Sequence, residues 1–151
     1  MKTFGFALSY LFVVMVQAIP SAMTSGPYGF AVGGGDNSTG EHFSFSAHDG
    51  PDGPTGYARV EFPTFTIQGP VTCYANDGPN AARFGIQITK ASGDVPAGSD
   101  GFVFAVIDNG DPGSAGPDLI GTGFTDTPPV VCPAQVAGTA VVTGNIVVDN
   151  P

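Results

Sequence analysis

The chain has 151 residues, of which four are Lys or Arg and thirteen are Asp or Glu, so its formal net charge is −9. Beyond Lys2 at the amino terminus, the only cations are Arg59, Arg83 and Lys90. Binding to the phosphates of a nucleic acid or to an anionic membrane surface needs clustered cations, so this composition argues against both.

The amino terminus has the features of a secretory signal peptide. Lys2 precedes the apolar run FGFALSYLFVVMV, which leads into the tripeptide VQA with the small-residue spacing that a signal peptidase accepts. The run is shorter than the roughly 18 residues that a membrane-spanning helix needs. We therefore expect residues 1–18 to be a signal peptide, cleaved after Ala18 or Ala22, and residues 19–151 to form one secreted domain without a membrane span.

Two cysteines, Cys73 and Cys132, lie in the expected mature chain. In an oxidising compartment they should pair, whereas a reactive or redox pair would favour a C-x-x-C motif, which the sequence lacks. Closing a loop of about sixty residues would stabilise the folded state by roughly 4 kcal/mol in the chain-entropy model. We therefore expect a structural disulfide.

The apolar residues of the mature chain alternate with polar ones, and Gly, Pro, Asn and Asp separate the apolar runs. This period of two is typical of β-strands, and no helical pattern is evident. GPYGFAVGGG at 26–35 is the first expected strand. In EHFSFSAHDG at 41–50 and GYARVEF at 56–62, apolar side chains occupy every second position, which predicts half-buried strands.

The turn sequence NDGPN at 76–80 separates two further strand patterns. In TFTIQGPVTCY at 64–74, the alternation places Val71 and Cys73 on the same face. ARFGIQITK, which ends at Lys90, is expected to form one strand with its isoleucines inward.

GFVFAVI at 101–107 is apolar at both odd and even positions, which predicts a central strand covered on both sides. A short strand is expected near DLIGTGF at 118–124, and a last one in AVVTGNIVVDN at 140–150, where Gly144 and Asn145 suggest a bulge. Seven or eight such strands predict an all-β domain, either an antiparallel β-sandwich or a small β-barrel, with one disulfide.

The loop DNGDPGSAGPD at 108–118 concentrates oxygen-bearing side chains. Asp108, Asn109, Asp111 and Asp118 are of the type that Ca²⁺ prefers, although the order of an EF-hand loop is absent. The alternative is a structural turn in which Asp108 caps its own backbone. We keep both interpretations, so Ca²⁺ is a possible ligand and no other cofactor is expected.

The remaining candidates for catalysis or metal binding are weak. His42 and His48 share a strand face, but six residues along a strand separate them by roughly 20 Å, too far to bind one metal ion. Glu41 and Glu61 are the formal pair for a glycosidase, yet the chain has no Trp and four Tyr to form a sugar platform. There is no G-x-S-x-G motif. We therefore expect no catalytic residues.

Asn37, Ser38 and Thr39 form an N-glycosylation acceptor sequence in a glycine-flanked loop. This triplet matters only if the chain comes from a eukaryote.

Several segments together are similar to a known family. They are GGGD at 33–36, VTCYANDGPNAARFGIQIT at 71–89, DNGDPG at 108–113, Cys132 and TGNIVVD at 143–149. In this order they resemble the post-COAP-like family of small secreted bacterial β-proteins, and the resemblance covers nearly the whole mature chain. It implies a compact extracellular β-module and names no reaction.

The expected function is therefore that of a secreted non-catalytic β-module for adhesion, surface or matrix interaction with an extracellular partner. The alternative is a calcium- or small-ligand-binding protein that uses the loop at 108–118. If the last strand leaves an exposed edge in AVVTGNIVV, a second chain could add to it, so the chain is a monomer or a strand-paired dimer.

Overall fold

The structure is a computed structural model and describes residues 28–111 and 116–151. The expected signal peptide lies outside the described residues. The described residues form strands, turns and loops without a helix, so none of their elements is a helix long and apolar enough to cross a membrane.

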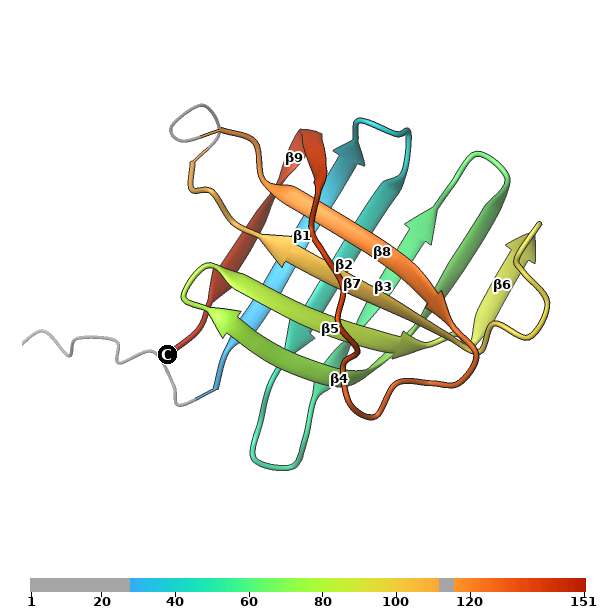
Figure 1. Cartoon of the computed structure of the whole chain (residues 1–151), viewed down its shortest axis with the longest axis horizontal. Helices are drawn as coiled ribbons and strands as arrows, with labels where there is room; N and C mark the ends of the chain where they lie inside the picture. The colour runs from blue at the N-terminus through green and yellow to red at the C-terminus, as the bar shows by residue number, and fades with distance from the viewer. Residues whose placement is uncertain (1–27, 112–115) are drawn as a thin grey trace, which may run out of the picture.

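Nine strands make up the regular structure of the described residues (Figure 1). They are β1 (Phe30–Asn37), β2 (His42–His48), β3 (Thr55–Glu61), β4 (Phe65–Gly78), β5 (Ala81–Gln87), β6 (Lys90–Gly93), β7 (Gly101–Ile107), β8 (Leu119–Thr125) and β9 (Thr139–Asp149). All of their pairings are antiparallel. This confirms the all-β class, with more strands than the seven or eight expected.

The strands form one sheet in the order β3-β2-β1-β9-β8-β7-β5-β4-β6, and an additional pairing of β3 with β4 closes it in a ring. Closure depends on the 14-residue β4, which has β3 and β6 as neighbours in its first part and β5 in its second. A sheet closed in this way corresponds to the small barrel of the two expected alternatives, and β6 lies beside the ring as an extra strand (Figure 1).

Aromatic side chains fill the interior of the ring. Phe43, Phe84, Phe102 and Phe104 are almost completely buried, and the rings of Phe84 and Phe104 stack at 4.5 Å between centroids. In β2 the burial alternates residue by residue, as the period of two predicts. Burying each Phe contributes about 1.5–3 kcal/mol relative to leaving it exposed, so this cluster stabilises the fold.

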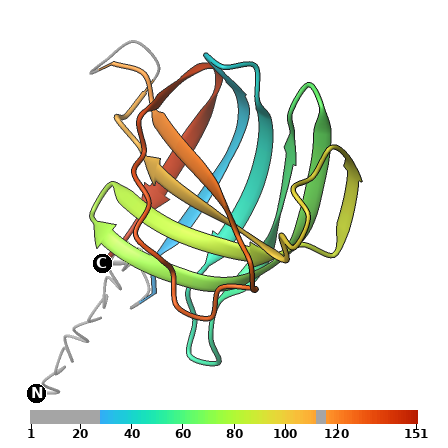
Figure 2. The same cartoon turned by 45° about the vertical axis from the view of Figure 1, so that its right-hand side comes forward.

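The segment at 126–138, which we call the strap, joins β8 to β9 and crosses the outside of the ring in front of β5 and β7 (Figures 1 and 2). The disulfide between Cys73 and Cys132 attaches it to β4, as expected. Thr72 Oγ1 also donates a hydrogen bond to the carbonyl of Pro129 at 2.7 Å. Both apolar faces of β7 are accordingly covered, and six of its seven residues are buried.

The prediction that Val71 and Cys73 face the same side is wrong. Val71 pairs with Ile86 but Cys73 pairs with Gly85, so β4 carries one extra residue at this point. Such a bulge reverses the parity of the strand. Val71 consequently belongs to the core, while Cys73 Sγ lies on the outer side, where a Cβ on Gly85 would meet it at 3.0 Å.

The segment ARFGIQITK is not one strand. β5 ends at Gln87, and the chain then turns so that Lys90–Gly93 forms β6, which pairs with the first part of β4. Thr89 N donates to Gln68 O at 3.0 Å and Ile88 N to Asp100 O at 2.9 Å. These two hydrogen bonds move Lys90 away from β5 and place it beside β4.

Candidate functional site

In the loop at 108–118, the carboxylates of Asp108 and Asp118 accept hydrogen bonds from backbone N–H groups. Asp108 Oδ1 accepts a hydrogen bond from Gly110 N at 2.7 Å, and its Oδ2 accepts one from Val148 N at 3.1 Å. Asp118 Oδ1 accepts from Asn109 N at 2.9 Å. Asp118 Oδ2 accepts from Ile146 N at 2.7 Å. The two aspartates therefore connect the loop to β9.

This connection compensates for a short pairing between β8 and β9. The two strands pair only at Leu119–Ala140 and Ile120–Thr139. Farther along β9, the two carboxylates satisfy backbone N–H groups that a neighbouring strand would otherwise satisfy. Asp118 is 7% exposed, so its hydrogen bonds are largely shielded from water.

Of the four candidate calcium ligands, Asp108, Asn109 and Asp118 meet in this network, and Asn109 Nδ2 donates to Pro117 O at 2.7 Å. Asp111 lies on the same loop and is exposed. Within residues 28–111 and 116–151, no three His, Cys, Asp or Glu side chains gather as a metal site would require. The contacts support a structural turn, and calcium binding stays a prediction.

Asn37 is not presented to solvent. It is 3% exposed, and its Nδ2 donates to Glu41 Oε2 at 2.8 Å. Its Oδ1 accepts from Thr39 Oγ1 at 2.8 Å and from the backbone of Thr39 and Glu41 at 3.0 Å. In the folded domain Asn37 is thus engaged with its neighbours, and its glycosylation stays a prediction.

Glu41 is a buried carboxyl group at 3% exposure. Its Oε2 contacts Asn37 and, at 3.4 Å, the hydroxyl of Thr122, while its Oε1 has no hydrogen-bond partner among the described residues. Burial raises the pKa of Glu41, and the hydrogen bonds from Asn37 and Thr122 oppose the rise. Glu61, by contrast, is partly exposed and forms an ion pair with Arg59. The two glutamates thus lie on opposite faces of the sheet and do not form a glycosidase pair.

The two histidines have separate partners on the outer face. His42 Nδ1 lies 2.9 Å from Asp36 Oδ1, and the hydroxyl of Thr143 donates to Asp36 Oδ2 at 2.5 Å. These contacts, first that of Thr143, lower the pKa of Asp36. His48 Nε2 lies 2.8 Å from Ser46 Oγ. The sequence did not indicate the first group because its members come from β1, β2 and β9.

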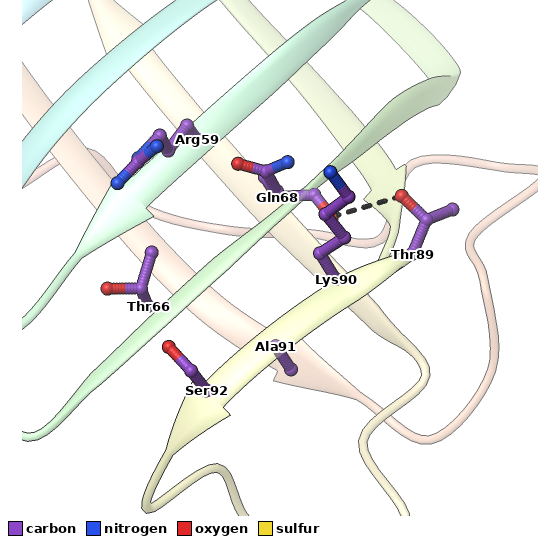
Figure 3. Close-up of a pocket in the computed structure, with 7 residues that line it drawn as sticks. All are labelled: Arg59, Thr66, Gln68, Thr89, Lys90, Ala91 and Ser92. Carbon is purple, nitrogen blue, oxygen red and sulfur yellow. Dashed lines mark hydrogen bonds between the residues drawn. The ribbon is translucent and has the colours of Figure 1, made fainter.

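A groove of about 660 Å³ lies on the outer side of β3, β4 and β6. Most of its lining residues have polar side chains, and two of them are cations. The lining residues are Arg59, Thr66, Gln68, Thr89, Lys90, Ala91 and Ser92 (Figure 3). Arg59 pairs with Gln68 across β3 and β4, and Gln68 pairs with Lys90 across β4 and β6. In Figure 3 these three side chains follow one another across the three strands.

Sequence reasoning missed this groove. In the sequence, Arg59 and Lys90 are isolated charges, and Lys90 ends the expected strand ARFGIQITK. The period of two predicts that Arg59 and Gln68 face outward. It does not predict that β6 pairs with β4, which brings Lys90 beside them.

Comparison of the chain with protein-family models, with curated proteins and with solved structures finds no match. The resemblance to the post-COAP-like family therefore stays a prediction.

Proposed function

We propose that this chain is a secreted, non-catalytic binding module that attaches to an extracellular surface or matrix component through its outer face. The observation on which the proposal rests is the location of the polar groove. The interior of the ring is packed with aromatic side chains, whereas the groove of about 660 Å³ lies outside, open to a partner.

The contacts of the other candidate groups agree with a non-catalytic role. Glu41 and Glu61 occupy opposite faces of the sheet. Ser46 and His48 form a close pair, but His48 packs its ring against Phe30, and no carboxylate hydrogen bond orients it within the described residues. A nucleophile activated by histidine ordinarily has such a third group. The same contacts favour attachment over hydrolysis.

The test is a retention assay on insoluble extracellular polymers. The oxidised mature chain is mixed with pectin gel, cellulose, chitin and peptidoglycan, and bound protein and released soluble fragments are both measured. We expect retention on at least one polymer without release of fragments. Release of fragments would contradict the non-catalytic assignment, and failure to bind any of the four would contradict attachment.

A further inference from the structure

We infer that the groove binds an acidic saccharide, with the carboxylate of a uronic acid unit held between Arg59 and Lys90. The inference rests on the proposed function and names the ligand class for it. The chemistry is that of a sugar ring carrying an isolated carboxylate, not that of a densely charged polyanion.

The distribution of positive charge is the first argument. The described residues contain three Lys or Arg side chains. Arg83 is committed to the fold, because it binds Asp77 through Nε and Nη2 at 2.5 and 2.9 Å and donates to the carbonyl of Pro133 at 2.9 Å. The two other cations both line the same groove. Among the described residues of this acidic chain, the two remaining cations thus lie at one point of the surface.

The geometry is suited to one carboxylate. Neighbouring strands lie about 4.8 Å apart, so the backbones of Arg59 and Lys90, with β4 between them, are roughly 10 Å apart. Arginine presents forked N–H donors that match a carboxylate, and lysine supplies a point charge from the other side. Within the part of the chain that the structure describes, no carboxylate pairs with Lys90, while Glu61 pairs with Arg59. These three charged side chains carry a local net charge of +1, which matches one carboxylate.

Neutral polar groups complete the site. Thr66, Thr89 and Ser92 line the groove with hydroxyl groups that can donate to and accept from sugar hydroxyls. Gln68 supplies an amide between the two cations, and its Nε2 donates to Tyr57 Oη at 3.0 Å. Tyr57 lies two residues before Arg59 on the same face and is 44% exposed. Its ring offers an apolar surface against which a sugar can pack.

The overall charge of the chain selects between classes of anion. The chain carries thirteen carboxylates against four Lys or Arg, so a polyanion as densely charged as a nucleic acid, with one charge per roughly 1.7 Å of its axis, is repelled outside the groove. A saccharide with one carboxylate per ring places most of its contacts on hydroxyl groups instead. Free phosphate shares the negative charge and can accept hydrogen bonds from the hydroxyl groups, but it has no ring to pack against Tyr57.

The experiment is calorimetric titration of the oxidised mature chain with trigalacturonate, with its fully methyl-esterified form as the matched neutral ligand. We expect binding of the acid and at least tenfold weaker binding of the ester. Lys90→Gln and Arg59→Gln should each weaken binding about tenfold, and Lys90→Arg should retain it. Equal binding of acid and ester, or binding insensitive to Lys90→Gln, would overturn the inference.

Two controls separate the contribution of Lys90 in the groove from the effect of net charge and from general anion binding. Val136→Glu changes the net charge by the same amount as Lys90→Gln at a residue that is 80% exposed on the strap, away from the groove, and should leave affinity unchanged. If inorganic phosphate displaces trigalacturonate at equal concentration, the groove is a general anion site and the saccharide assignment is overturned. If the wild-type chain ignores trigalacturonate but is retained on a polymer, the inference fails while the proposed function stands.

Discussion

The carboxylate of Asp118 accepts a hydrogen bond from the backbone N–H of Ile146 at 2.7 Å, in the place where β8 and β9 no longer pair. Its other oxygen accepts from Asn109 N. One buried side chain therefore fixes both the acidic loop and the last strand. It shows how a loop that looks suited to metal binding can serve the backbone instead.

Asp118→Ala should lower the free energy of unfolding by about 3 kcal/mol, because it leaves the N–H of Ile146 without its partner. Urea unfolding of wild type and variant measures the difference. Asp126→Ala removes an exposed aspartate and should change stability by less than about 0.5 kcal/mol. If Asp118→Ala lowers the free energy of unfolding no more than Asp126→Ala does, the role of this hydrogen bond is refuted.

Excess CaCl₂ should leave the thermal midpoint of the domain at residues 19–151 unchanged relative to EGTA. The carboxylates of Asp108 and Asp118 already accept backbone N–H groups, and these hydrogen bonds would have to be weakened for both to turn to a metal ion. A ligand that binds only the native state must raise the midpoint. A rise of several degrees that disappears in Asp111→Ala would establish the calcium alternative.

The stability of wild type should fall as pH rises from about 4 towards neutrality, through a contribution of Glu41. Its pKa in the folded chain is raised by burial, so the folded state holds the proton more tightly than the unfolded chain, whose pKa is about 4.3. Stability from this group is complete below the unfolded pKa and is lost as pH rises through the folded one. Glu41→Gln should therefore gain stability relative to wild type as pH rises.

The measurement is chemical unfolding of both proteins at several pH values between 4 and 7. Glu61→Gln, which removes a carboxyl from the exposed outer face, is the matched control. A difference between Glu41→Gln and wild type that stays constant over this range would rule out a raised pKa at Glu41.

Removing the disulfide should destabilise the domain and release the strap. In the chain-entropy model, a crosslink over a sequence separation of 59 residues is worth roughly 4 kcal/mol. The double substitution Cys73→Ser and Cys132→Ser should lower the free energy of unfolding by an amount of that order. Limited proteolysis should then cut within 126–138 before the rest of the chain. Cleavage at the same rate with and without the disulfide would show that Arg83 and Thr72 hold the strap on their own.

The elements that sequence reasoning placed correctly are those whose signal is local. The alternation of β2 and the two apolar faces of β7 follow directly from side-chain parity along one strand. The pairing of Cys73 with Cys132 follows because the chain has no other cysteine. Each of these features depends on neighbours in sequence or on composition alone.

The sequence by itself determined the strand character of the chain, its acidity and its single disulfide. Only the tertiary structure decided the closure of the ring through β3 and β4, the bulge that turns Cys73 outward, and the position of Lys90 beside Arg59. The physical reason is that strand partners and register are set by contacts between segments far apart in the chain. One inserted residue reverses the face of every side chain that follows it, and no local pattern records which strand will lie alongside.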